Sequence, residues 1–208
     1  MITIWGRVNS VNVQKVVWCC DELALPYERI DAGLKFGRLD EPEYLAINPT
    51  GHIPTLVDGD FVLWESNSIL RYLAMQYGQS SLLYPAEPKA RASVDRWLDW
   101  ASTALAPAER PVFLTLVRTP AAQRNTVKLA ADIEAVTALW KMLDTQLQGR
   151  FFIEGEQFTL ADIVLGAFAK RWLDLEGVAR PSLPNLERWY SRLATRPGFK
   201  KYIDLPLT

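Results

Sequence analysis

The spacing of apolar residues changes once along the chain, and this change divides it into two parts. The first part begins with a short apolar strand at Ile2–Trp5, and a second strand is expected at Tyr27–Asp31. Between them, apolar residues recur with the i, i+3, i+4, i+7 spacing of an amphipathic helix, at Val13, Val16, Val17 and Cys20. The pattern predicts a strand, a helix and a strand, with the two strands parallel and joined by a right-handed crossover.

A hairpin and two helices complete the first part. A short helix is expected at Pro42–Ile47. The runs Thr55–Val57 and Phe61–Trp64 are rich in β-forming residues, and Asp58-Gly59-Asp60 between them supplies the positive-φ positions of a tight turn. A polar helix start then leads into a helix that is expected to end near Tyr77. The predicted order is therefore β-α-β-α-β-β-α.

In the second part the strand signals nearly vanish. Residues 78–88 contain a glycine, two serines and two prolines, which is typical of an interdomain linker. Helical spacing dominates beyond the linker, and Pro107 and Pro111 are expected to kink or interrupt the first helical stretch. The predicted helical stretches are residues 89–105 and 121–147, one beginning after Thr159, and one beginning at Pro184. The fold class is thus α/β followed by all-α, with domains at residues 1–78 and 89–208.

Charge and hydropathy exclude two classes of partner. The chain of 208 residues carries a net charge of −1, which lacks the basic footprint of a nucleic-acid-binding protein. Its apolar runs are far shorter than a membrane span, and residues 1–5 do not resemble the start of a signal peptide. We therefore expect a cytosolic protein with no nucleic-acid or membrane partner.

Few side chains are available for metal or nucleophilic chemistry. The single histidine, His52, and the adjacent pair Cys19-Cys20 do not form a zinc-site pattern or a disulfide framework. Cys20 lies on the apolar stripe of its helix, so core packing is expected for the pair. The sequence contains no nucleophile elbow, dinucleotide fingerprint or Walker A motif. If the protein is an enzyme, we expect it to take its nucleophile from a co-substrate.

The loop before the hairpin and the helix after it predict a binding site. Pro49 and Gly51 break the preceding structure, and Glu65-Ser66 stand at the start of the next helix. The backbone of such a loop and the free N–H groups of such a helix suit an anionic, peptide-like ligand.

Three motifs in this order resemble those of the soluble glutathione transferases, and the resemblance covers essentially the whole chain. They are Asn48-Pro49-x-Gly51-His52-Ile53-Pro54-Thr55-Leu56, Glu65-Ser66-Asn67-Ser68-Ile69 and Phe158-Thr159-Leu160-Ala161-Asp162. The N-terminal loop, with Ser10 before Val13 and Val16, resembles that of the serine-type branch of the family. This branch is theta- and delta-like and includes many bacterial members. The resemblance implies a thioredoxin-like, glutathione-binding domain at 1–78 and a helical domain at 89–208 that lines the electrophile site.

The resemblance also implies how glutathione is held. Pro54 would follow a cis peptide bond, and the main chain of Ile53 would pair with the cysteinyl part of glutathione. Glu65 would bind the γ-glutamyl ammonium, while Ser66 and the helix N-terminus would bind its carboxylate. Thr159 and Asp162 would form a capping box, a structural role.

Four further polar residues complete the implied site. His52 and Lys35 are candidates for the glycyl carboxylate of glutathione. Ser10 would donate a hydrogen bond to the glutathione sulfur, and Asn12 would share or replace that role. Taken by itself, Ser10 favours a helix cap, and only the surrounding motifs reverse that interpretation, whereas Asn12 could either cap the helix or face the sulfur.

The implied activity is conjugation of glutathione to a small hydrophobic electrophile by a homodimer. Glutathione would be a co-substrate, with no prosthetic group and no metal. Glutathione-dependent disulfide reduction or peroxidase activity, and a binding module without turnover, stay open as alternatives. The sequence also leaves open whether Phe113 or any tryptophan lines the electrophile pocket.

Overall fold

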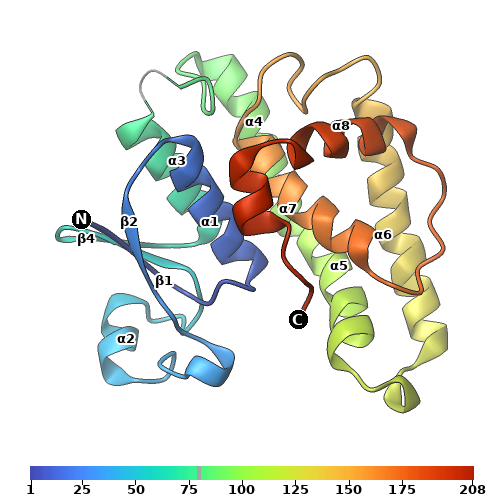
Figure 1. Ribbon diagram of the computed structural model, residues 1–208, viewed down its shortest axis with the longest axis horizontal. Helices are drawn as coiled ribbons and strands as arrows, with labels where there is room; N and C mark the ends of the chain where they lie inside the picture. The colour runs from blue at the N-terminus through green and yellow to red at the C-terminus, as the bar shows by residue number, and fades with distance from the viewer. Residues whose placement is uncertain (79–80) are drawn as a thin grey trace.

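A computed structural model describes residues 1–78 and 81–208 of the chain. A small mixed sheet with helices occupies one side of the molecule, and a larger group of helices occupies the other (Figure 1). Both predicted parts are therefore present. Positions 79 and 80 of the predicted linker lie outside the described residues.

The sheet has four strands in the order β2-β1-β3-β4. β1 (Ile2–Trp5) pairs in parallel with β2 (Tyr27–Ile30), as the βαβ pattern predicts. β3 (Thr55–Asp58) runs antiparallel to β1 and to β4 (Phe61–Trp64). Gly59 has a φ of 62° in the turn between β3 and β4, so the predicted hairpin is confirmed.

Three helices accompany the sheet, and their order confirms the predicted β-α-β-α-β-β-α arrangement. α1 (Val11–Glu22) and α3 (Ser66–Tyr77) pack against each other, and the short α2 (Pro42–Ile47) lies on the far side of the sheet from them in Figure 1. Cys19 and Cys20 on α1 are free and fully buried, as core packing requires. Burial raises the pKa of the Cys20 thiol to about 12, which keeps it protonated at neutral pH.

The second part consists of helices grouped around one central helix. Besides shorter turns, its members are α4 (Pro88–Trp100), α5 (Ala106–Phe113), α6 (Thr126–Gln146), α7 (Leu160–Asp174) and α8 (Pro184–Ala194). α7 packs against α4, α5 and α8 and also against α1, so it joins the two parts of the molecule (Figure 1). Since nearly all of its residues are buried, α7 is the core helix that its apolar sequence predicts.

The capping box of α7 is confirmed and is tied to the rest of the helical part. The Asp162 carboxylate accepts hydrogen bonds from Thr159 N at 2.9 Å and Ile153 N at 3.0 Å. It also accepts one from Trp189 Nε1 on α8 at 2.8 Å. Asp162 is fully buried, so its role is structural, as predicted.

The two prolines of α5 do not stop the helix. The backbone stays helical from Pro88 to Arg118, but π-helical turns at 101–105 and 114–118 flank α5, which contains Pro107 and Pro111. A proline lacks the N–H that a regular α-helix needs, and a π-helical turn adjusts the hydrogen bonding locally. The expected interruption is thus a change in helix type.

None of the helices that the structure describes is at once long and apolar enough to cross a bilayer.

Candidate functional site

A cleft lies where the loops of the N-terminal part face α5 and α7. Its volume is about 370 Å³. From the N-terminal part it is lined by four of the predicted site residues, which are Ser10, Asn12, His52 and Ile53. From the helical part it is lined by apolar and basic side chains, including Phe113. The structure therefore brings the residues predicted near the glutathione sulfur together with a wall of apolar and basic side chains.

Ser10 sits at the N-cap position of α1, but its side chain does not cap the helix. Its backbone is extended, with φ −91° and ψ 121°, and its carbonyl oxygen accepts the Gln14 N–H at 2.8 Å. The hydroxyl makes no capping hydrogen bond, although an N-cap serine commonly does. Because Ser10 lines the cleft and its hydroxyl makes no capping bond, that hydroxyl is free to donate to a group in the cleft.

The loop before Pro54 is fixed by hydrogen bonds from buried side chains. The Ile53–Pro54 peptide bond is cis, as expected. The His52 carbonyl oxygen accepts from Tyr44 Oη at 2.6 Å and from Asn48 Nδ2 at 2.8 Å, and both donors are buried. In the part of the chain that the structure describes, no hydrogen bond engages the main-chain N–H or C=O of Ile53. An extended peptide can pair with a backbone segment of this kind.

The two candidates for the glycyl carboxylate differ in position. His52 is exposed at the edge of the cleft, with Nδ1 2.5 Å from the Thr50 carbonyl oxygen. Lys35 is exposed on a short 3₁₀ turn, where its Nζ lies 5.1 Å from the centre of the Phe36 ring, and it does not line the cleft.

Glu65 and Ser66 lie at the start of α3. Neither of them lines the cleft, and Pro54 does not line it either. Glu65 is exposed and has φ 72° and ψ 109°. Ser66 is the first residue of the helix and is 6% exposed. A positive φ is uncommon outside glycine and concentrates at functional sites, which supports a binding role for this helix start.

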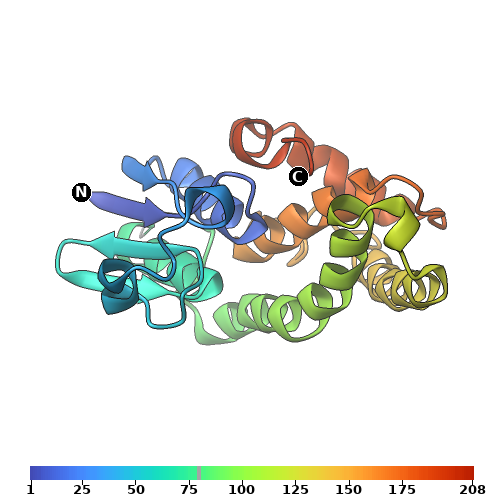
Figure 2. The same ribbon diagram turned by 90° about the horizontal axis from the view of Figure 1, so that it is seen from below.

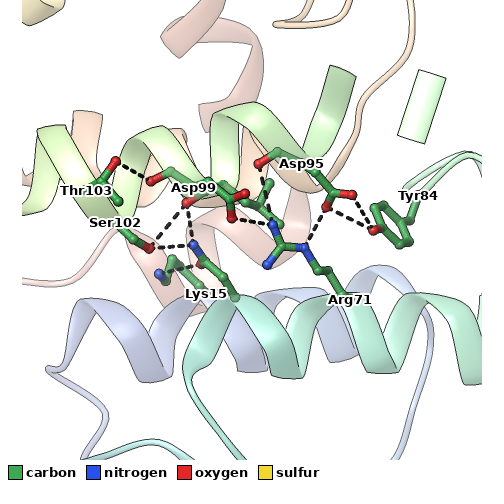
Figure 3. Close-up of polar contacts among 9 residues, drawn as sticks. Lys15, Arg71, Tyr84, Asp95, Asp99, Ser102 and Thr103 are labelled. Atoms are coloured by element: carbon green, nitrogen blue, oxygen red, sulfur yellow. Dashed lines mark hydrogen bonds and ion pairs between the residues drawn. The ribbon is translucent and has the colours of Figure 1, made fainter. Parts of the chain in front are cut away.

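A buried lysine that the sequence analysis missed lies behind this helix start. Lys15 on α1 donates from Nζ to Asn67 Oδ1 on α3 at 3.0 Å, and Asn67 Nδ2 donates to Leu98 O at 2.7 Å and Ser102 Oγ at 3.0 Å (Figure 3). Burial lowers the pKa of Lys15 to about 7, an effect that the charge of Glu65 opposes. The only sequence signal was a charged residue among the closely spaced apolar residues of a short helix.

Four arginines line the cleft, and the sequence analysis missed them too. Arg7 follows β1, Arg110 is on α5, Arg118 follows α5 and Arg171 is on α7. They are widely separated in sequence and belong to no motif, so only the fold reveals that they meet. Of the aromatic residues considered for the pocket, Phe113 lines it.

Comparison with known proteins places this cleft in a family. The profile described as the glutathione S-transferase N-terminal domain matches residues 1–75, and the profile of the C-terminal domain of the same family matches residues 105–197. Along its full length the chain is 41% identical to glutathione S-transferase GstB of Escherichia coli (strain K12), all of which is covered. The chain belongs to the glutathione S-transferase family.

Other members support the serine-type resemblance. The chain is 30% identical to glutathione S-transferase D6 of Drosophila melanogaster, covering 90% of this chain and 84% of that protein. The crystal structure of a theta-class glutathione S-transferase from Xanthomonas axonopodis pv. citri, with glutathione bound, superimposes with a TM-score of 0.94. That enzyme is 43% identical, and the match covers 100% of this chain and 99% of that one. Similarity to theta-class and insect members of the family agrees with a serine at the start of α1.

Proposed function

We propose that the protein is a glutathione transferase that conjugates the thiolate of glutathione to small electrophiles. The observation that carries the proposal is the Ser10 hydroxyl, which lines the cleft at the N-terminus of α1 and does not cap that helix. Family membership over nearly the whole chain supports the same activity.

Thiolate stabilisation follows from the position of Ser10. A free thiol has a pKa of about 8.5, so little thiolate is present at neutral pH. A hydroxyl donor and the N-terminus of α1 both favour the negatively charged form. Lowering the thiol pKa by about two units corresponds to roughly 2.7 kcal/mol and makes the thiolate the main species. The sulfur then attacks an electrophilic carbon, and the leaving group departs with its bonding electrons.

The other predicted residues are proposed to hold the tripeptide. The main chain of Ile53 pairs with its cysteinyl part beyond the cis bond to Pro54. Glu65 binds the γ-glutamyl ammonium, and Ser66 with the N–H groups of α3 binds the adjacent carboxylate. His52 at the cleft edge and, further out, Lys35 bind the glycyl carboxylate. Glutathione is thus a co-substrate, and no prosthetic group is involved.

The domain division belongs to the proposal. Residues 1–78 form the glutathione-binding domain, and residues 89–208 supply the wall of the electrophile site. We further propose that the active form is a homodimer in the cytosol. Gel filtration with light scattering tests the dimer, and cell fractionation tests the location.

The test is retention on immobilised glutathione together with turnover of 1-chloro-2,4-dinitrobenzene. We expect retention, elution by free glutathione, and formation of the thioether conjugate with release of chloride. A protein that binds no glutathione at millimolar concentration contradicts the proposal. If glutathione disulfide forms from a peroxide or disulfide substrate while no thioether forms, the reductase alternative replaces it.

A further inference from the structure

The positive charge of the cleft is concentrated on the wall that faces the proposed thiolate. Arg110, Arg118 and Arg171 come from the helical part, and Arg7 comes from the loop that also leads to Ser10. Among the described residues that line the cleft there is no aspartate or glutamate. A site for a purely apolar electrophile has no need of four guanidinium groups.

Among the side chains that the structure describes, one carboxylate is paired with an arginine of this wall, and its single charge is too small to neutralise the four arginines. Glu109 Oε2 is 3.8 Å from Arg171 Nη1, and Glu109 is fully buried. Burial raises the pKa of the Glu109 carboxyl to about 8, although the charge of Arg171 opposes this. Even when Glu109 is ionised, it offsets one of four positive charges. Counted over the described side chains, the cleft therefore keeps a net positive charge whether Glu109 is protonated or ionised.

The arginines are close enough to repel one another. The charges of Arg118 and Arg171 reinforce burial in lowering the pKa of Arg7. Two guanidinium groups lie close to the Phe113 ring, whose centre is 4.0 Å from Cζ of Arg171 and 5.3 Å from Cζ of Arg118. Like charges gathered in a partly desolvated cleft are costly, and a bound anion offsets that cost.

The donors of these arginines are largely uncommitted in the part of the chain that the structure describes. Arg7 Nε is buried and has no hydrogen-bond partner there. Arg118 Nη2 donates to the main-chain oxygen of Thr208 at 3.2 Å. Apart from the Phe113 ring, the contact that the structure gives for Arg171 is the distant ion pair with Glu109 described above. A hydrogen bond donated to an anionic ligand by a buried guanidinium nitrogen that has no other partner contributes most to the binding free energy.

We propose that the electrophile this site prefers carries a carboxylate or a comparable anion close to its reactive carbon, as an α-halo acid does. The inference rests on the proposed glutathione transfer and replaces the expected apolar electrophile with an anionic one. The arginine wall holds the anion while the carbon faces the sulfur near Ser10. The thiolate forms a carbon–sulfur bond as the carbon–halogen bond breaks, and halide leaves with the electron pair. The thiol proton has already passed to solvent.

A matched pair of substrates tests the charge preference. Iodoacetate and iodoacetamide alkylate thiols by the same displacement and differ in charge. For each reagent, the measured quantity is the rate acceleration, which is the catalysed rate divided by the uncatalysed rate of its reaction with glutathione. We expect the acceleration for iodoacetate to be about tenfold or more greater than that for iodoacetamide. Cys19 and Cys20 are fully buried, so direct alkylation of the protein is not expected to interfere.

Single variants connect the preference to the arginine wall. Arg110→Gln and Arg118→Gln should each lower kcat/KM for iodoacetate about tenfold while changing the value for iodoacetamide little. Arg118→Lys, which keeps the charge, should retain part of the preference. Arg188→Gln, at an exposed arginine of α8 that does not line the cleft, makes the same change in net charge and should leave the ratio unchanged.

Three results would overturn the inference. The first is equal acceleration of the two reagents by the wild-type enzyme. The second is an equal loss for both in the arginine variants, because the arginines would then act on glutathione or its thiolate. The third is a preference that Arg188→Gln lowers as much as Arg118→Gln does.

If the protein turns over neither reagent nor a neutral aryl halide and binds no glutathione, the proposed transferase function itself has failed. Thermal unfolding of each variant verifies that it is folded.

Discussion

At the scale of single residues, Ser10 is the group on which the proposed chemistry depends. Its hydroxyl lines the cleft and makes no capping bond. Replacing it by alanine removes one hydrogen bond to a charged sulfur, which is worth about 1.5–3 kcal/mol. We expect Ser10→Ala to lower kcat/KM roughly 10- to 100-fold and to raise the pKa of bound glutathione. The pH dependence of thiolate absorbance in the complex measures this pKa directly.

Asn12 provides the matched comparison for Ser10. It lines the same cleft one residue into α1, and it is partly exposed. If Ser10 is the main donor, Asn12→Ala should leave the thiol pKa nearly unchanged. A larger pKa shift in Asn12→Ala than in Ser10→Ala would reverse the two roles. Unchanged pKa values in both variants would assign thiolate stabilisation to the helix N-terminus alone.

The proposed site residues that the sequence could indicate are those that stand in short motifs. Ile53 and Glu65 belong to motifs whose spacing is fixed by a loop and a helix start, so one sequence suffices to find them. Arg118 and Arg171 belong to no such pattern, because what joins them is the packing of α7 against α5. Neighbouring residues in the sequence are enough to predict a turn or a helix cap. The charge of a cleft wall depends on which distant residues the tertiary structure brings together.

At the scale of elements, the contact between α1, α3 and α4 depends on the buried Lys15. Lys15 is 2% exposed, and its ammonium donates to Asn67, which in turn donates to the Leu98 carbonyl oxygen of α4 (Figure 3). On the same face Arg71 Nε of α3 donates to Asp95 Oδ1 of α4 at 2.6 Å (Figure 3). Buried polar contacts of this kind fix how helices meet, but they add stability only when every charge is satisfied.

Lys15 should therefore make stability depend on pH. Its pKa is about 7 in the folded protein and about 10.4 in an unfolded chain. Between these values the unfolded chain binds a proton that the folded protein does not, so the free energy of unfolding rises with pH, by roughly 5 kcal/mol in all. Below pH 7 both states are protonated, and the cost of the buried charge is constant. Lys15→Met should remove this rise and be more stable than wild type at neutral pH.

Denaturant titrations at a series of pH values from 6 to 10 measure the effect. The useful quantity is the difference between wild type and Lys15→Met, since other groups titrate equally in both. Lys35→Met, at an exposed lysine, is the control and should run parallel to wild type. Parallel curves for Lys15→Met as well would show that Lys15 stays charged in the fold. The charges of Glu65 and Arg171 act on it in opposite directions.

The elements themselves were largely predictable from apolar spacing, and the exceptions have a local cause. α2 and α3 begin and end where the caps and breakers place them. The helical region around Pro107 was expected to be kinked or interrupted. Instead the backbone stays helical, and π-helical turns on either side of α5 adjust the hydrogen bonding where the prolines lack an N–H. Hydrophobic periodicity locates a helix, whereas the type of its turns depends on how its neighbours hold it.

At the scale of the whole molecule, the sheet-containing part and the helical part lie side by side (Figure 2) and meet where α1 packs against α7. The cleft is lined by residues of both parts. This arrangement explains why each part alone is insufficient for the proposed reaction. The loops around Ser10 and Ile53 supply the proposed thiol site, and α5 and α7 supply the opposing wall. The sequence predicted both parts from their composition of strands and helices. It did not predict the electrostatics of the space between them.

One surface of the N-terminal part is suited to contact a second copy of the chain. β4 is an edge strand of the sheet, and its Phe61 is 46% exposed. The Phe61 ring lies 4.8 Å from that of Tyr72, which lies 6.3 Å from that of Tyr77, centre to centre. The two tyrosine hydroxyls donate to Asp58, which holds the rings together. An exposed aromatic cluster beside an open strand edge is a common feature of association surfaces.

If the active form is a homodimer that buries this cluster, a charge at its centre should separate the subunits. Phe61→Lys should raise the dimer dissociation constant about 30-fold or more, the effect typical of a buried aromatic anchor. Val127→Lys is the matched control, because Val127 is 82% exposed on α6 and the change in charge is identical. Light scattering over a range of protein concentrations measures both variants. Dissociation caused equally by the two variants, or a wild-type protein that is monomeric throughout, would exclude this surface as the dimer contact. Since each subunit carries its own cleft, a Phe61→Lys monomer that still binds glutathione would show that association is separable from the site.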